Sequence, residues 1–145
     1  MLFRLEIVTL DRLVFAEDID FVVVPGSEGE LGILARHAPL ISTLKPGELR
    51  IRRGTDIEYY AIGGGFVQVR PDKVVVLADI AEHADEIDES RAQEARERAE
   101  QELRDFPERA AEARAALRFA HARLQIVQRR AARPTRRSAP TRDNP

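Results

Sequence analysis

Apolar and polar residues alternate along the first 86 residues of the chain, and glycine or proline interrupts the alternation. A period of two is typical of strands with one buried face, so this region is predicted to be β-structure rather than amphipathic helix. Two short stretches show the pattern best, with apolar side chains at every second position: Phe3, Leu5 and Ile7, then Ile19, Phe21 and Val23. We expect the second stretch to end in a turn at Pro25-Gly26.

Later breaks in the alternation divide the rest of this region into short segments of strand length. The breaks fall at Pro46-Gly47, Gly54-Thr55-Asp56 and Pro71-Asp72. They separate predicted strands at residues 49–53, 57–62, 66–70 and 73–78. About eight to ten strands at this spacing predict an antiparallel β-sandwich or barrel.

From Asp88 onward the composition changes to Ala, Glu and Arg, which favours helix. Asp88 is a predicted helix cap, and Pro107 follows a break and suits the start of a second helix. Apolar residues three and four apart give each helix one apolar face: Ala92, Ala95, Ala99 and Leu103 in the first, Ala110, Ala113, Leu117, Ala120, Leu124 and Val127 in the second. The short break predicts an antiparallel helical hairpin with a weak, alanine-rich seam.

The chain therefore divides into three predicted parts: a β-sandwich docking domain over residues 1–86, a two-helix hairpin over 87–132 and a basic tail over 133–145. The tail has four basic residues, one acidic residue and no apolar face, so we expect it to be disordered. The sandwich part has nine basic and 15 acidic residues, and the hairpin part ten and nine. No part is dense enough in basic residues to favour nucleic-acid binding.

The residues of common catalytic and metal sites are missing or badly placed. Cysteine is absent, and His37, His83 and His121 lack the paired spacing of metal ligands, so we expect no metal site. Gly63-Gly64-Gly65 lies between two predicted strands, where it is expected to bend the sheet rather than bind phosphate. We therefore expect no enzyme active site. The amino terminus lacks the pattern of a secretory signal, and no apolar run is long enough to span a membrane.

Several motifs resemble the epsilon subunit of bacterial and chloroplast F-type ATP synthases. They cover about residues 2–130 in the family's order, and they read GSEGELGIL at 26–34, RHAPL at 36–40, KPG at 45–47, GGGF at 63–66, VVVLAD at 74–79 and IDESRA at 87–92. The resemblance implies a ten-strand sandwich followed by a two-helix hairpin. It also implies a non-catalytic rotor subunit on the cytoplasmic face of the bacterial membrane, with membrane contact only through the complex.

In that family the sandwich binds the gamma subunit and rests on the ring of c subunits. The resemblance thus implies that Glu28, Glu30 and His37 face the ring. The plainer alternative is that these residues and their neighbouring glycines only shape turns.

The family's hairpin either folds against the sandwich or extends along gamma to contact the alpha and beta catalytic subunits and inhibit ATP hydrolysis. The candidates for inhibitory contacts are basic residues of the second helix: Arg109, Arg114, Arg118, Arg123, Arg129 and Arg130. The alternative for each of them is solvation of a charged helix face.

The segment Ile87–Ala92 resembles the family's ATP-binding motif, so ATP is the expected regulatory ligand. The candidate residues of the motif itself are Ile87, Asp88, Arg91 and Ala92. By position, Glu82 before the motif, Arg98 after it and Arg123 on the second helix also match residues near the nucleotide in that family. One expected arginine is replaced by Phe119, and Arg118 is turned by about 100° from that position. The alternative is that Asp88 only caps a helix and Arg91 only pairs with a carboxylate.

Two other functions stay open on sequence alone. One is an autonomous nucleotide sensor, which ATP titration of the purified chain would test. The other is a nucleic-acid or adaptor module that uses the basic tail, whose binding would depend on salt.

Overall fold

Eight strands precede two long helices in the computed structural model, which describes residues 1–131. The strands are β1 (Phe3–Val8), β2 (Leu13–Ile19), β3 (Phe21–Gly26), β4 (Gly29–Ile33), β5 (Leu40–Arg53), β6 (Asp56–Arg70), β7 (Lys73–Ala78) and β8 (Ala81–His83). The helices are α1 (Glu89–Asp105) and α2 (Ala110–Ala131), with one-turn 3₁₀ helices η1 (Ala84–Glu86) and η2 (Pro107–Arg109) before them. The predicted order, β-structure first and a helical hairpin second, is confirmed.

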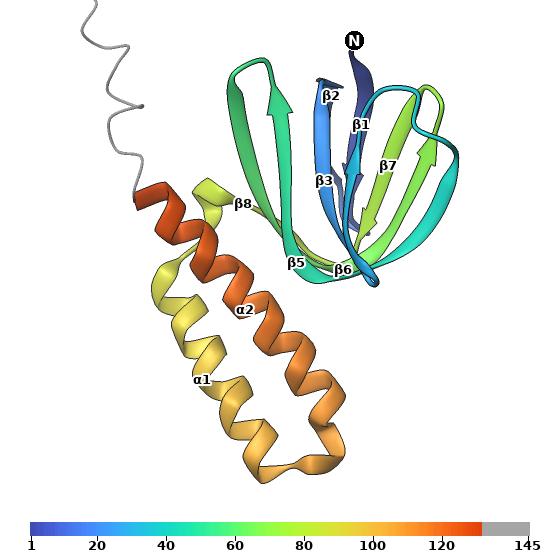
Figure 1. Cartoon of the computed structure of the whole chain (residues 1–145). Coiled ribbons are helices and arrows are strands. Elements are labelled where there is room, and N and C mark those ends of the chain that lie inside the picture. The colour runs from blue at the N-terminus through green and yellow to red at the C-terminus, as the bar shows by residue number, and fades with distance from the viewer. Residues whose placement is uncertain (132–145) are drawn as a thin grey trace, which may run out of the picture.

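The strands form one curled sheet in the order β2-β1-β7-β6-β5-β3-β4, with β8 added beside β6 (Figure 1). Because β5 and β6 are long and bent, the sheet folds over itself as a sandwich. Neighbouring strands are antiparallel except β1 and β7, which are parallel. The sequence predicts antiparallel pairing throughout, so this parallel pair is an exception. It is possible because β1 and β7 are far apart in the chain and are not joined by a tight turn.

The sandwich core follows the alternation of the sequence. Phe3, Leu5 and Ile7 are buried on one face of β1, whereas Arg4 on the other face is exposed. The largest fully buried side chains of this core are aliphatic: Leu5, Ile7, Ile19, Ile33, Leu49, Ile51, Ile62, Val22, Val24, Val67 and Val69. No polar or charged residue among those described is buried, so burial of apolar area stabilises this core.

Two sequence predictions about the chain around β3 are wrong. Ile19, Phe21 and Val23 do not share a strand, because the chain changes direction at Asp20 between β2 and β3. Asp20 holds this corner, since its backbone N–H donates to the Arg52 carbonyl at 3.0 Å and its carboxylate accepts from the Gly54 N–H at 2.6 Å. Pro25 and Gly26 are the last residues of β3 rather than a turn.

Pro46-Gly47 also does not end a strand, because β5 runs through it. Gly63–Gly65 lies between the predicted strands 57–62 and 66–70; the predicted bend is present, but the two segments form one strand, β6. Gly64 and Gly65 have φ of 109° and 132°, which side chains rarely adopt. A Cβ on Gly65 would lie 2.1 Å from the Leu77 carbonyl oxygen, so the strands approach too closely there for any side chain.

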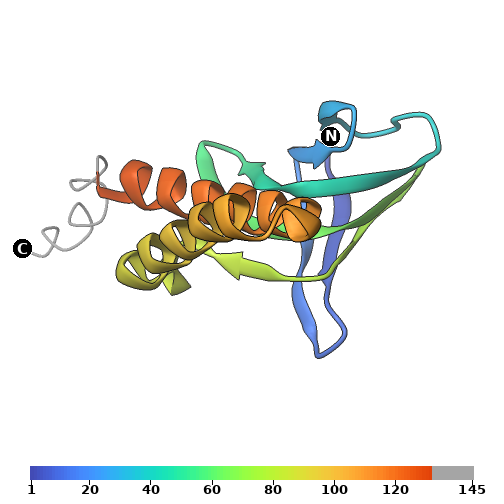
Figure 2. The same ribbon diagram turned by 90° about the horizontal axis from the view of Figure 1, so that it is seen from below.

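The two helices lie side by side as an antiparallel hairpin against one side of the sheet (Figures 1 and 2). Asp88 caps α1 as predicted, with its carboxylate accepting from the Arg91 N–H at 3.2 Å. The buried residues of the seam are mostly alanines: Ala92, Ala99, Ala113, Ala120 and Val127. Each alanine buries about one methyl group, under ~1 kcal/mol, so the helices pack closely but weakly.

Within residues 1–131, neither helix combines the length and the apolar character needed to cross a membrane. The predicted tail at 133–145 lies outside the described residues.

Candidate functional site

The hairpin meets the sandwich through one face of α2. Ile126 and Val127 of this helix are buried with Ala61 of β6 and with Ile87, which precedes α1. Tyr59, Ala84 and Phe119 are partly buried around them. This small cluster is separate from the sandwich core, and we call it the junction.

Three arginines of α2 add polar contacts across the junction. Arg123 Nε lies 2.8 Å from Glu82 Oε1 of β8, with only 13% and 23% of the two side chains exposed. Arg129 pairs with Glu48 of β5, and the Glu48 side chain is only 8% exposed. The Arg129 guanidinium also lies 5.1 Å from the centre of the Tyr59 ring.

Arg130 makes the third contact, with backbone rather than with a carboxylate. It donates to the carbonyl oxygen of Ala84, and at 3.4 Å to that of Ile87. Both acceptors lie on the segment that links β8 to α1. Arg130 therefore ties the end of α2 to the start of the hairpin.

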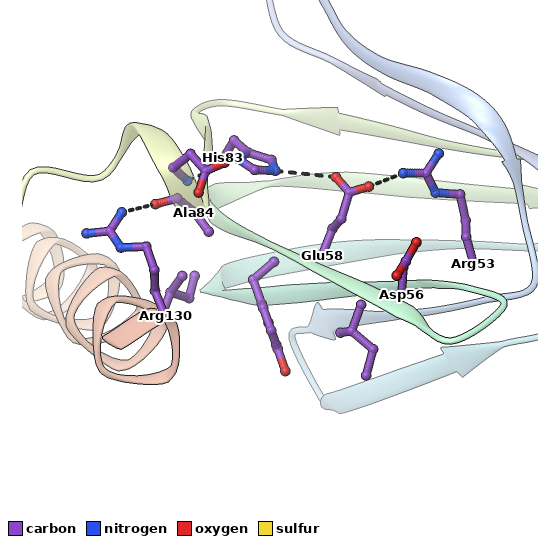
Figure 3. Close-up of a pocket in the computed structure, with 10 residues that line it drawn as sticks. Arg53, Asp56, Glu58, His83, Ala84 and Arg130 are labelled. Atoms are coloured by element: carbon purple, nitrogen blue, oxygen red, sulfur yellow. Dashed lines mark hydrogen bonds and ion pairs between the residues drawn. The ribbon is translucent and has the colours of Figure 1, made fainter. Parts of the chain in front are cut away.

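A hollow of about 530 Å³ opens beside this contact, between the β5–β6 turn, η1 and the end of α2 (Figure 3). Glu58 lies between His83 and Arg53, pairing with Arg53 and lying 3.3 Å from His83 Nε2. His83 Nδ1 accepts from the Asp85 N–H at 3.0 Å, which places the imidazole proton on Nε2, toward Glu58. His83 thus caps η1, the turn that also supplies the Ala84 carbonyl to Arg130.

Tyr60 is buried next to His83, one of the residues that line this hollow. Burial, and next the Glu58 carboxylate, raise the pKa of its hydroxyl from 10.0 to about 12. The Tyr60 ring makes edge-to-face contacts with the rings of Phe15 and His83, at centroid distances of 6.1 and 5.0 Å. Tyr60 therefore stays neutral at physiological pH and acts as packing.

The structure brings some of the ATP candidates together. Glu82 and Arg123 form the ion pair described above, although they are 41 residues apart in the chain. Asp88 serves as the cap of α1, and the adjacent Arg91 is exposed.

The other ATP candidates are separated. Ile87 is buried in the junction, Ala92 is buried in the seam between the helices, and Arg98 is exposed on α1. None of the seven candidates lines the hollow in Figure 3.

Phe119, which stands where an arginine is expected, packs beside the junction. The Arg123 guanidinium lies 5.3 Å from the centre of its ring. Arg118 is exposed.

The candidates for ring contact lie in a turn, in strand β4 and in a loop, and they have separate neighbours. Glu28 is exposed in the turn between β3 and β4, and Glu30 lies 3.5 Å from Arg50. His37 Nδ1 lies 2.8 Å from the Ala38 carbonyl oxygen in the loop before β5, next to Arg36, whose φ is 66°.

The candidates for inhibitory contacts fall into two groups. Arg109, Arg114 and Arg118 are exposed, and Arg109 lies over the Phe106 ring at 5.0 Å. Arg123, Arg129 and Arg130 are half-buried by the contacts described above with β8, with β5 and with the segment that links β8 to α1. In this folded posture the second group is occupied within the chain.

Two family models match the chain one after the other. The β-sandwich domain of the ATP synthase delta/epsilon chain matches residues 2–84, and the long α-helix domain of the same chain matches residues 85–128. The chain belongs to the ATP synthase delta/epsilon chain family. The match spans both the sandwich and the hairpin.

Sequence relatives agree with this family. The ATP synthase epsilon chain of Dehalococcoides mccartyi strain CBDB1 is 50% identical over 134 residues, which are 90% of this chain and 96% of that relative. The epsilon chain of Herpetosiphon aurantiacus is 51% identical over 130 residues, 88% of this chain and 95% of the relative. This family member is accordingly an epsilon-type, non-catalytic subunit.

Solved structures also resemble this fold. A chain in the mitochondrial ATP synthase of Euglena gracilis, solved as OSCP/F1/c-ring, aligns with a TM-score of 0.75 and 26% identity over 88% of this chain and 81% of its own length. A chain in the Tetrahymena thermophila mitochondrial ATP synthase aligns with a TM-score of 0.51 and 16% identity, over 59% and 69% of the two chains, which shows the fold alone.

The sequence patterns did not predict the sandwich side of the junction, namely Glu48, Tyr59 and Ala61. Ile126 was not predicted to be a contact residue either, because it does not belong to the apolar seam predicted for the second helix. A signal existed: Phe119, Ala122 and Ile126 form a second apolar stripe three and four residues apart.

Proposed function

We propose that the chain is a central-stalk subunit of an F-type ATP synthase, coupling proton movement to ATP synthesis and restraining ATP hydrolysis through its mobile hairpin. In this proposal the sandwich docks on the gamma subunit and the c-ring, at the cytoplasmic face of a bacterial membrane. The hairpin contacts the alpha and beta subunits after it leaves the sandwich. Family membership and the bacterial relatives support this assignment.

The observation that carries the regulatory part is the narrow attachment of the hairpin. Of the elements described after the sandwich, α2 alone packs broadly on the sheet, through one small apolar cluster and three arginines, while α1 packs on α2. Contacts of this size are worth a few kcal/mol in total, so the hairpin can separate without unfolding the sandwich.

A cross-link across the junction tests this proposal. The native chain has no cysteine, so Glu82→Cys and Arg123→Cys introduce one pair of thiols across the junction. A short bis-maleimide linker then holds the hairpin against the sandwich. In the complex reassembled with its partner subunits, the linked subunit is expected to lose its inhibition of ATP hydrolysis.

The matched control is the same double variant without the linker, which carries the substitutions but leaves the hairpin free. If the linked and unlinked subunits inhibit hydrolysis equally, release of the hairpin is not required and the regulatory proposal fails.

An exposed apolar patch supports docking of the sandwich on gamma. Phe66 and Leu77 are direct cross-strand neighbours and are about half exposed, and Ile41 lies on the adjacent strand β5 with 69% exposure. Apolar side chains clustered on an outer sheet face mark a protein interface. Phe66→Ala is expected to weaken gamma binding about tenfold, whereas Phe106→Ala in the hairpin turn is not; equal binding of both variants would refute this surface.

ATP as a regulatory ligand remains a prediction. The Asp88 cap and the Glu82–Arg123 pair are compatible with the alternative in which these residues only hold the fold. Calorimetric titration of the chain with ATP decides between them. Arg91→Ala is expected to weaken binding at least about tenfold. Arg104→Ala, which removes an exposed arginine from the same helix, is expected to leave binding unchanged. No heat at millimolar ATP, measured at two temperatures, would exclude the ligand.

A further inference from the structure

A second hollow, of about 310 Å³, lies between the two helices. Its polar lining comes from both helices: Glu89, Gln93 and Arg96 of α1, and His121, Gln125 and Gln128 of α2. We call it the outer groove. None of the ATP candidates lines it, and neither does any residue of the junction.

Arg96 is the unusual residue of this groove. Its Nε is covered from solvent, and in the part of the chain that the structure describes it has no hydrogen-bond partner. Arg96 also forms no ion pair with any described residue, although Glu100 lies one helical turn further along. An acceptor from outside the chain cannot reach the covered Nε, but Arg96 lines the hollow and its two Nη groups form no ion pair with a described residue, so they can donate to such an acceptor.

The neighbours of Arg96 are rich in further donors. Gln93, Gln125 and Gln128 each carry an amide NH₂ group, and His121 adds an imidazole N–H. Glu89 is the carboxylate of the lining, but it is exposed, so solvent screens its charge. Guanidinium and amide groups that line one hollow can donate to the oxygens of a tetrahedral anion.

We propose that the outer groove binds inorganic phosphate, with Arg96 donating two parallel N–H groups to it. The volume is at the lower end for ligand sites and suits a small hydrated anion rather than a nucleotide. Because both helices supply donors, the anion binds only while they are paired, and by mass action it stabilises the hairpin. This site does not depend on assembly with other subunits, so it is tested on the isolated full chain.

The test follows the side-chain amide signals of the glutamines by NMR during titration with phosphate. Chloride is exchanged for phosphate so that ionic strength stays constant. Saturable shifts are expected for Gln93, Gln125 and Gln128 at millimolar phosphate, together with a higher melting temperature. Arg96→Gln is expected to weaken binding roughly tenfold or more.

Two further variants make the outcome specific. Arg104→Gln removes an exposed arginine from the same helix and is expected to leave the titration unchanged. Arg96→Lys keeps the charge without the paired N–H groups and is expected to bind with intermediate affinity. Shifts that do not saturate, that survive Arg96→Gln, or that appear around Arg91 and Arg123 instead would overturn the proposal.

Discussion

Replacing Ile126 by alanine is expected to release the hairpin while leaving the sandwich folded. Ile126 is fully buried in the junction. The substitution removes three carbon atoms at ~0.8 kcal/mol each, and the cavity left behind raises the loss to about 3 kcal/mol. Alanine has the higher helix propensity, so the loss falls on the contact with the sheet and not on α2 itself.

Hydrogen exchange measured by mass spectrometry reads this effect directly. A loss of about 3 kcal/mol lowers the protection of amides that exchange through hairpin release roughly 100-fold. The affected peptides are those of α1 and α2. Peptides from β1 and β7 are expected to keep their protection, because their core does not include Ile126.

Ile41→Ala is the matched control, since it removes the same atoms from a residue that is 69% exposed. We expect it to change protection little in either part of the chain. The reasoning is refuted if Ile126→Ala lowers protection of β1 and β7 as much as that of α2, because the hairpin and the sandwich then open as one unit. It is equally refuted if α2 keeps its native protection.

Two further predictions concern the sandwich. Tyr60 has a raised pKa, so its neutral form stabilises the fold fully below pH 10 and this contribution is lost as the pH rises through about 12. Near-ultraviolet titration should show one tyrosine ionising late until unfolding exposes it, and Tyr60→Phe should remove that step; a native chain whose two tyrosines titrate together would contradict this. Gly65→Ala, which puts a Cβ against the Leu77 carbonyl, is expected to cost more than ~3 kcal/mol in urea unfolding. Gly54→Ala, at a φ of 61° with open space around it, should cost only ~1 kcal/mol, and equal costs would argue against the close approach.

Local patterns predicted the parts of the fold that depend on local contacts. The alternation at Phe3–Ile7 gave the buried face of β1, and Asp88 gave the start of α1. The predictions were wrong where contacts between residues distant in the sequence determine the path of the chain. Asp20 turns the chain because Gly54 and Arg52 lie opposite it, and no residue near Asp20 in the sequence indicates that corner.

The junction could have been predicted in part from β6. Strict alternation fails at Tyr59, Tyr60, Ala61 and Ile62, four consecutive residues that are all buried or half-buried. A strand with both faces covered needs a second layer, and here that layer is α2. The sequence does not say which apolar stripe of α2 supplies it, because the seam and the junction use overlapping residues such as Val127.

The arginines of α2 connect this geometry to the proposed regulation. Arg129 and Arg130 are both bound within the folded chain, so in this posture they are unavailable to another subunit. Releasing Arg129 would expose Glu48 without its partner, but Arg50 also lies 3.5 Å from Glu48 and would keep that carboxylate paired. The cost of release is therefore smaller than for an isolated covered pair, in which removing one partner leaves a lone charge. Arg50, the second cation beside Glu48, thus lowers the free-energy cost of separating the hairpin from the sandwich.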